Sequence, residues 1–408
     1  MSQLTSRERV RMALNHKEPD KVPIDFGAMR STGISAMGYN KLKEYLGIKG
    51  GHTKVYDILQ QLAEPELEVL KIMEGDVIQL HRLEPAFGIN RKSWKPGKLP
   101  DGSDCLVPEG FNPVRNEKGD LEILVDGIPV GRMPEGGFYF DVVHHPYENV
   151  QTKADIDKLP VPVITDEELE FLRAEAKKMY EETDYAILGA FGGNIFEQGQ
   201  FDWGYVRYYT ELALNPELIH YYHQRLADAY VVMLERYLGA VGEYIDVIQF
   251  GDDLGTQQNP QISVDMYRKM IKPYHKVQYQ YVQQHYPNVK VFIHCCGSIY
   301  DLIPDLIDAG VQVLNPVQLS ARNMDPVKLK KEFGKDLVFW GGGCNTQTTA
   351  TFGTVEDIKE EVERYMKIFA PGGGFVFTQI HNIQANVSPE KVMAIYETAK
   401  KLRNYPVK

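Results

Sequence analysis

The residues best suited to chemistry lie in one short stretch, VKVFIHCCGS, at positions 289–298. A β-branched run ends there in His294, and two cysteines follow. Residues two apart in a strand point to the same face. If the strand continues through Cys296, then His294 and Cys296 share one side and Cys295 faces away. One nitrogen and one sulfur are therefore predicted to face a common point, where they can bind a single metal ion.

A third cysteine, Cys344, follows another apolar run in the segment LVFWGGGCNT at 337–346. Glycines 341–343 allow the chain to bend there, so that the thiol can point inward. One histidine and two cysteines form a known catalytic zinc set that leaves one position open, and thiolates suit zinc better than magnesium or calcium. The alternative is that all three cysteines are buried packing residues. A redox pair of the two adjacent cysteines is disfavoured, because such a bridge is strained.

The elements that position these residues alternate along the chain. Eight short apolar runs are predicted as strands, with helical patterns between most of them, and continuous apolar runs suit parallel strands covered on both faces. This alternation predicts an α/β fold of the (β/α)₈ TIM-barrel type, with a doubly wound open sheet as the alternative. In a barrel, His294, Cys296 and Cys344 would meet at one mouth. The predicted strands span 22–26, 76–80, 185–191, 244–250, 289–294, 311–315, 337–341 and 374–379.

One segment breaks this alternation. Residues 82–150 are rich in Gly, Pro and Asp and are predicted as hairpins, which makes them a β-rich insertion after the second strand. We expect the whole chain, 1–408, to form one barrel domain with this insertion at the mouth, where loops build the site. The insertion is interpreted as a substrate lid or, equally, as a surface feature or a homodimer contact.

Composition narrows the class of protein. The chain has 408 residues, 43% of them hydrophobic, which is enough for a large core. Its net charge of −11 gives no general electrostatic reason to bind nucleic acid or an anionic membrane. No apolar stretch has the length of a signal peptide, and none reaches the roughly 18 residues of a spanning helix. We therefore expect a cytoplasmic protein, in which clustered cysteines indicate metal binding or catalysis rather than disulfides.

Polar residues that follow other predicted strands complete the candidate site. Asp253, after the fourth strand, is predicted as a catalytic residue, either a proton donor or a fourth zinc ligand, although a turn acid would look the same. His381 and Asn382 follow the eighth strand, and we assign His381 a catalytic role and Asn382 a contact with substrate. A hydrogen bond that only stabilises the loop is the alternative for both residues.

Further residues at strand ends are predicted to contact substrate. Phe191 belongs to an aromatic segment that can form either a wall for a methoxylated ring or ordinary core; its other members are Phe196, Phe201 and Trp203. A lone histidine such as His81 is more often structural, and a glutamine can simply satisfy backbone groups. With these alternatives open, the remaining substrate-binding candidates are Gln79, His81 and Gln318.

Longer motifs resemble one known group of proteins. The opening RERVRMALNHKEPDKVPIDFG (7–27) resembles the uroporphyrinogen decarboxylase superfamily. So do three later segments: GDDLGTQQNPQISVDMYRKMIKPYH (251–275), HCCGSIYDLIPDLIDAGVQVLNPVQ (294–318) and APGGGFVFTQIHNIQANVSPEKVMAIYE (370–397). The resemblance covers most of the chain outside the insertion. It implies a (β/α)₈ barrel with the active cleft at the C-terminal mouth.

The superfamily contains two chemistries. Its decarboxylases carry a basic RQAGR motif near the N-terminus, whereas here the corresponding DFGAMRSTGISAMGY (25–39) has Arg30 as its sole arginine. The other branch comprises zinc-dependent methyltransferases with a His-x-Cys pair and a distant cysteine, a pattern that His294, Cys296 and Cys344 match. The resemblance thus implies bound Zn²⁺ and a partner protein that carries a corrinoid (cobalamin).

Three functions follow from these observations. The first is zinc-dependent methyl transfer between the corrinoid protein and a small molecule, either as demethylation of a donor such as a methoxylated aromatic or as methylation of a thiol or pterin. The second is metal-independent decarboxylation of a small or porphyrinogen-like acid. The third is a catalytically idle barrel that binds a corrinoid or tetrapyrrole.

Overall fold

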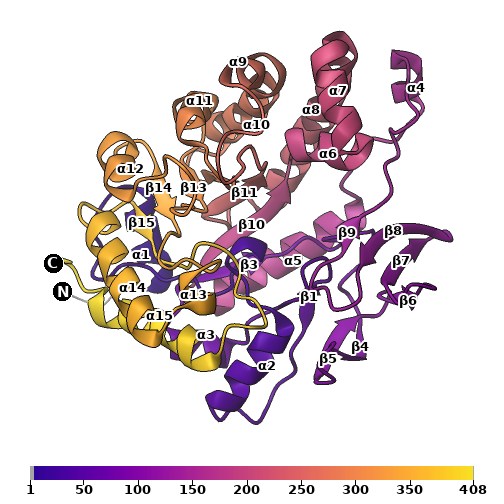
Figure 1. Cartoon of the computed structure of the whole chain (residues 1–408). Coiled ribbons are helices and arrows are strands. Elements are labelled where there is room, and N and C mark those ends of the chain that lie inside the picture. Colours follow the sequence, from indigo (N-terminus) through magenta and orange to yellow (C-terminus); the bar gives the residue numbers. More distant parts are fainter. Residues whose placement is uncertain (1–3, 408) are drawn as a thin grey trace.

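A computed structural model describes residues 4–407, and its centre is a curved sheet of parallel strands (Figure 1). Seven strands lie side by side in the order β3-β10-β11-β12-β13-β14-β15, and every neighbouring pair is parallel. The predicted α/β barrel is confirmed by this order. The strands are β3 (Val77–Leu80), β10 (Ala186–Gly192), β11 (Val247–Gly251), β12 (Lys290–His294), β13 (Val313–Asn315), β14 (Val338–Trp340) and β15 (Phe375–Val376).

The segment 22–26 takes the eighth place and closes the ring, although it pairs too briefly to form a regular strand. On one side Ile24 bridges Phe377 in parallel, and Phe377 donates its N–H to Pro23 O at 2.8 Å. On the other side Asp76 donates its N–H to Ile24 O at 2.7 Å. The predicted strand 22–26 is therefore present as a short stretch of pairing, held chiefly through Ile24.

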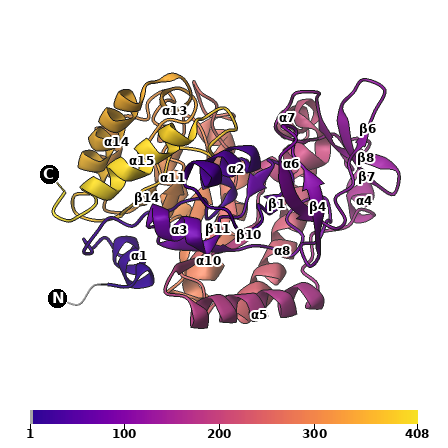
Figure 2. The same ribbon diagram turned by 90° about the horizontal axis from the view of Figure 1, so that it is seen from below.

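Helices cover the outside of the sheet, and Figure 2 shows α5 and α8 along one side of it and α14 and α15 towards another. Within residues 4–407 no helix is long and apolar enough to cross a membrane. The helices are α1 (Ser6–Leu14), α2 (Ala36–Tyr45), α3 (Leu67–Met73), α4 (Lys153–Asp157), α5 (Asp166–Glu182), α6 (Phe196–Trp203), α7 (Tyr205–Leu214), α8 (Pro216–Val241), α9 (Val264–Met266), α10 (Lys272–His285), α11 (Ile303–Ala309), α12 (Pro326–Phe333), α13 (Thr349–Phe352), α14 (Val355–Phe369) and α15 (Pro389–Leu402).

Helix α1 closes the N-terminal end of the barrel. Its buried side chains, Val10, Ala13 and Leu14, belong to the same apolar cluster as Val77 and Val338, which come from the strands. The hydroxyl of Thr5 accepts the N–H of Glu8, and the Glu8 carboxylate accepts the N–H of Thr5, so a capping box starts the helix. With this end filled by apolar side chains, the C-terminal mouth is the end left for a polar site.

The insertion after β3 is built from hairpins, as predicted. One two-stranded sheet pairs β4 with β5, and a second sheet has the order β6-β7-β8-β9. Both lie to one side of the barrel (Figure 1). The strands are β4 (Trp94–Lys98), β5 (Asp104–Pro108), β6 (Val114–Arg115), β7 (Leu121–Val125), β8 (Ile128–Met133) and β9 (Asp141–Val142), while the small hairpin β1 (Val55–Asp57) and β2 (Leu62–Ala63) precedes β3.

A loop of the insertion is tied to the last loop of the barrel. Between β8 and β9, the hydroxyl of Tyr139 donates to Asn382 Oδ1 at 2.9 Å, and Gln384 donates its side-chain N–H to the same hydroxyl. The next residue, Phe140, donates its N–H to Leu59 O at 2.8 Å. These contacts hold the insertion beside the loop that follows β15.

His223 of α8 makes the fold sensitive to acid. It is fully buried, with Nε2 2.7 Å from the Tyr208 hydroxyl and Nδ1 2.9 Å from Met270 O. Burial lowers the pKa of His223 to about 3. Below pH 6.5, His223 is therefore protonated in the unfolded chain but stays neutral in the folded chain. The free energy of unfolding consequently falls as the pH drops.

We expect protonation of His223 in the unfolded chain to lower the unfolding free energy by about 2 kcal/mol between pH 6.5 and pH 5. Urea unfolding at several pH values measures that slope. His223→Gln, which is neutral throughout, should show a shallower decline over this interval than the wild type. Parallel curves for the two proteins would contradict the assignment.

Candidate active site

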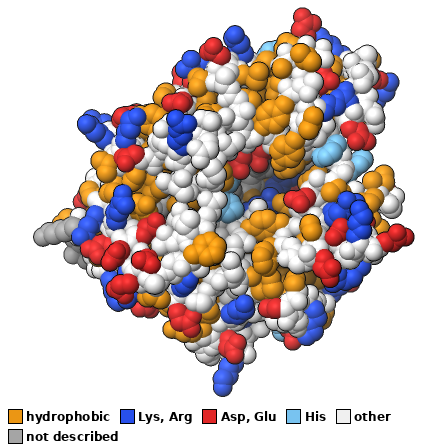
Figure 3. Space-filling view, viewed as in Figure 1, with side chains coloured by type: hydrophobic (Ala, Val, Ile, Leu, Met, Phe, Trp, Pro, Cys, Tyr) orange, Lys and Arg blue, Asp and Glu red, His pale blue; other side chains and the backbone are white. Residues whose placement is uncertain are grey.

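A chamber of about 300 Å³ opens at the C-terminal ends of the barrel strands. Figure 3 shows a hollow near the centre of this face, where acidic, basic and histidine side chains meet between hydrophobic ones. Residues from the ends of β3, β10, β11 and β12, and from the loop after β15, line it, as expected for a barrel mouth. Among the lining residues are Arg30, Asp57, Gln79, His81, Phe191, Asn194, Glu197, Phe201, Asp253, His294 and His381.

His294, the last residue of β12, is held in one orientation by Asn315 at the end of β13. The Asn315 amide donates Nδ2–H to Trp340 O at 2.8 Å, which directs its Oδ1 towards His294 Nδ1, also at 2.8 Å. Because Oδ1 only accepts, Nδ1 must carry the proton. Nε2 is therefore left with a free lone pair, as required of a metal ligand.

Three potential ligands converge beside that lone pair. One ligand atom each from His294, Cys296 and His381 lies within 4.8 Å of the others. Cys296 Sγ is 3.3 Å from His294 Nε2. Burial lowers the pKa of His381 to about 4, so this imidazole is neutral near pH 7. Two imidazoles and a thiol form a donor set that zinc accepts and that magnesium and calcium disfavour.

Two adjacent aspartates after β11 have different roles. Asp253 lines the chamber, and its Oδ1 accepts the Cys296 N–H at 2.7 Å and lies 3.7 Å from His294 Nε2. Asp252 is fully buried and pairs with His275 Nε2 at 2.7 Å. It also accepts three N–H groups at the start of α6, those of Ile195, Phe196 and Glu197. Asp253 is thus placed for chemistry, whereas Asp252 supports the fold.

Within the described residues, the predicted ligand Cys344 is not one of the three residues of this group. In the described part of the chain, the cluster of potential ligands contains His381 in its place. Cys344 is buried after β14, where burial, then the charge and hydrogen bonding of Glu361 on α14, raise the pKa of its thiol. Cys295 is also buried, and its Sγ accepts the Leu254 N–H at 3.4 Å.

The predicted substrate contacts divide into two groups. Gln79, His81 and Phe191 line the chamber, while Gln318 and Asn382 are not among its lining residues within 4–407. Gln318 Oε1 accepts the Gly297 N–H at 2.7 Å and so holds the loop after Cys296. Asn382 is buried and donates to Gln60 Oε1 at 2.7 Å, in addition to its contact with the insertion. For these two residues the geometry favours loop stabilisation over contact with substrate.

Sequence reasoning assigned no role in the chamber to Arg30 or Glu197. Arg30 pairs with Asp57 through Nε, and its side chain is 40% exposed where it lines the chamber. Glu197 accepts Asn194 Nδ2–H at 2.7 Å, and burial, then the charges of Asp253 and Asp252, raise its pKa well above the usual value. The glycine pair Gly192–Gly193 at the end of β10, where both residues have a positive φ, was the available signal for a turn next to Glu197.

Comparison with known proteins identifies the family. The sequence model of uroporphyrinogen decarboxylase (URO-D) matches residues 142–402. The chain belongs to this family. The matched part contains His294, Cys296, His381 and Asp253, whereas most of the insertion lies outside it.

Curated relatives agree with this assignment, and a solved structure shares the fold. Uroporphyrinogen decarboxylase from Chlorobium limicola is 27% identical over 263 residues, which are 62% of this chain and 70% of that protein. The enzyme from Chlorobaculum parvum is 24% identical over 261 residues, with the same coverage of both chains. A methyltransferase from Methanosarcina mazei superposes with a TM-score of 0.59 over 98% of this chain and 99% of its own. At 17% identity, that likeness establishes the shared barrel fold.

The hydrogen bond to His294 makes Asn315 a positioning residue whose loss should be measurable. Asn315→Ala removes the acceptor for Nδ1–H, and we expect the affinity for zinc to fall roughly 10- to 100-fold. Asn315→Asp keeps an acceptor and should retain most of that affinity. Competition with a chromogenic chelator measures both variants. Equal losses in the two would show that the amide matters for folding rather than for the histidine.

Proposed function

We propose that this chain is a cytoplasmic, zinc-dependent methyltransferase of the URO-D family that works with a corrinoid protein. It moves a methyl group between a small molecule and the corrinoid (cobalamin) of that partner. A methoxylated aromatic is the proposed donor when the reaction is a demethylation. A thiol or pterin is the proposed acceptor when the transfer runs in the other direction.

The convergence of His294, Cys296 and His381 inside the chamber carries this proposal. The donor set suits zinc, and Asp253 lies beside it as a candidate fourth ligand. The barrel shared with the Methanosarcina mazei methyltransferase supports the same reaction class. We therefore propose His294, Cys296 and His381 as the metal ligands, with Cys344 outside the set.

Zinc held there supplies a Lewis acid that polarises a heteroatom or keeps a thiol deprotonated near neutral pH. In the demethylation, the methyl group leaves its donor without the electrons of the broken bond, which stay on the heteroatom. The reduced corrinoid provides the electron pair for the new bond, and a proton from solvent neutralises the product.

The chain's own residues orient the small molecule in this reaction. Phe191 and Phe201 offer apolar surface to a ring in the chamber. Arg30 uses Nε for Asp57, so its terminal N–H groups are placed to bind an anionic substituent. Asp253 fixes the backbone of Cys296, which keeps the thiol next to His294.

Elemental mass spectrometry of the purified protein is the first test. We expect about one zinc per chain, and the zinc-loaded protein should demethylate 2-methoxyphenol in the presence of reduced cobalamin, followed by the absorbance change of the corrinoid. The proposal fails if the protein binds no stoichiometric metal even after reconstitution.

The names of the curated relatives favour decarboxylation as a second candidate reaction. We propose a small acid as its substrate and no role for a metal. Release of carbon dioxide by the metal-free protein would support it. A porphyrinogen is the less favoured substrate, because its many carboxylates need several cations and Arg30 is the sole arginine of the segment 25–39.

A further inference from the structure

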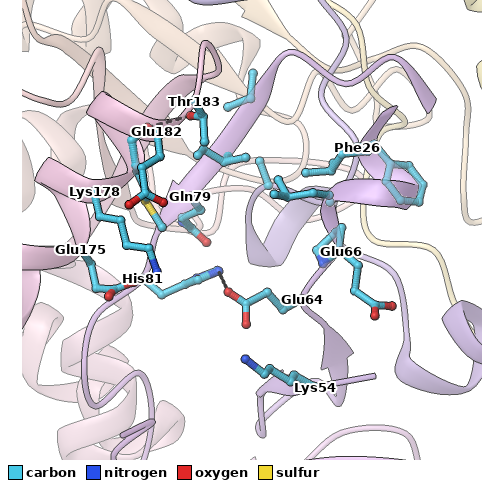
Figure 4. A pocket seen from close by; sticks show the side chains of 18 of the residues that line it. Phe26, Lys54, Glu64, Glu66, Gln79, His81, Glu175, Lys178, Glu182 and Thr183 are labelled. Atoms are coloured by element: carbon cyan, nitrogen blue, oxygen red, sulfur yellow. Dashed lines mark hydrogen bonds and ion pairs between the residues drawn. The ribbon is translucent and has the colours of Figure 1, made fainter. Parts of the chain in front are cut away.

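A second and larger cavity lies outside the barrel wall, between α3, α5 and β3 (Figure 4). Its volume is about 570 Å³, within the usual range for small-molecule sites. Phe26, Leu70, Ile78 and Met179 are among the apolar side chains that line it. Charged side chains surround them, including Lys54, Glu64, Glu66, Glu175, Lys178 and Glu182. We call this space the lateral cavity.

The lateral cavity exists because the barrel wall is incomplete at this point. Hydrogen bonds between Ile24 and Asp76 join the segment 22–26 to β3. Beyond this point, the described residues 25–28 make no hydrogen bond with residues 77–80. The chain after β3 enters the insertion, so the next long helix is α5, which begins only at Asp166. A gap therefore remains beside β3 that side chains of α3 and α5 line without filling.

His81 stands at the boundary between the lateral cavity and the chamber, since it lines both. Its side chain is only 7% exposed, yet neither ring nitrogen makes a hydrogen bond within the described residues. Burial, then the charges of Arg91 and Arg30, lower the pKa of His81 well below its usual value. The ring is therefore neutral near pH 7 and carries one unused N–H donor and one unused acceptor.

The partner of His81 can be deduced from its distance to Glu64. His81 Nε2 lies 3.9 Å from Glu64 Oε1, too far for a hydrogen bond, and Figure 4 shows the two groups facing each other across the cavity. One oxygen atom at about 2.8–3.0 Å from both would lie roughly 2 Å to the side of the line that joins them. A hydroxyl there accepts from the imidazole N–H and donates to the carboxylate, and so satisfies both groups at once.

The charges of the lateral cavity disfavour an ionic ligand. Glu64 already binds Arg91 at 3.3 Å, and Glu66 binds Lys43 at 2.5 Å. The remaining cations and carboxylates are mixed around the opening, so neither sign dominates. A ligand charge placed against the apolar lining would lose its hydration without a matching partner.

We propose that the lateral cavity binds a small neutral molecule with an apolar ring and one hydroxyl group, such as a phenol or an aryl alcohol. The ring lies against Ile78 and Met179, and the hydroxyl bridges His81 and Glu64. The site is separate from the proposed metal ligands, although His81 joins it to the chamber.

Fluorescence titration with 2-naphthol tests the proposal on the full-length protein, without added metal or corrinoid. Saturable binding is expected. His81→Phe keeps the ring but removes both nitrogens, and it should weaken binding roughly tenfold. Met179→Trp fills the lateral cavity without touching the chamber and should weaken binding at least as much. The matched control Val206→Trp, at a site that is 84% exposed on α7, should change it less than about twofold.

Two results would overturn the proposal. No saturable binding by a folded protein would mean that only water bridges His81 and Glu64. Binding that survives Met179→Trp but is lost in Phe201→Trp would place the ligand in the chamber. If His81→Phe does not fold, the Met179→Trp result decides alone. Because metal and corrinoid are absent, failure here leaves the proposed methyl transfer untouched.

Discussion

Under the proposed function, replacing His294 by alanine should abolish zinc binding and reduce methyl transfer to background. Outer-sphere partners of metal ligands change affinity about 10- to 100-fold, so loss of a ligand should exceed 100-fold. Of the proposed ligands, His294 has the most closely defined role, because Asn315 fixes its proton on Nδ1 and directs Nε2 at Cys296. Zinc content by elemental mass spectrometry and affinity by chelator competition measure the effect. His285→Ala, an exposed histidine on α10, is the matched control and should retain its metal.

Two further variants separate the two ligand sets. The geometry predicts that His381→Ala loses zinc while Cys344→Ala retains most of it. The pattern of the sequence alone predicts loss in Cys344→Ala. Cys295→Ala should retain zinc in either case. Loss in Cys344→Ala together with retention in His381→Ala would contradict the set proposed here.

Asp76, at the start of β3, should be the most damaging single acid to remove for stability. Its carboxylate is 2% exposed and binds Arg9 at 2.6 Å and Arg403 at 2.5 Å. It also accepts the Ile24 N–H at 2.9 Å and the Ser6 hydroxyl at 2.7 Å. Asp76→Ala leaves two buried guanidinium groups short of their anion, which costs about 3–5 kcal/mol of the unfolding free energy.

Urea unfolding followed by circular dichroism measures this loss. Asp166→Ala is the matched control, because its carboxylate also pairs with an arginine, Arg236, but is 90% exposed. An exposed pair of this kind contributes less than about 1 kcal/mol. Similar unfolding midpoints for the two variants would show that the buried contacts of Asp76 do not contribute the expected stability.

The sequence predicted the strands well because their signal is local. Runs such as 185–191 are apolar on both faces, and that pattern depends on burial alone. The largest error in a strand start is at 244–250, where β11 begins at Val247. Tyr244 instead belongs to the turn after α8 and donates its N–H to Val241 O. Strand composition cannot distinguish an apolar turn from the strand that follows it.

The ligand set was harder to predict, because it depends on the direction of loops. His294 and Cys296 are fixed by strand alternation, and both belong to the converging group. Cys344 follows three glycines, so the sequence left the direction of its side chain open. His381 follows a short strand, and its approach to His294 depends on the closure of the whole ring. The lateral cavity likewise exists because the segment 22–26 and β3 pair only briefly. Nothing in the residue pattern of either segment predicts that their pairing stops early.

The contact between Tyr139 and Asn382 has a mechanical consequence. Asn382 is the immediate neighbour of His381, one of the proposed metal ligands, so the insertion is coupled through a single peptide unit to the metal site. A displacement of the insertion that keeps this hydrogen bond pulls on the Asn382 side chain and so on the backbone next to His381. The position of the insertion and the position of the proposed ligand His381 are therefore coupled. An event on the rim of the barrel, such as the arrival of a large partner, would in this way be transmitted to the reacting centre.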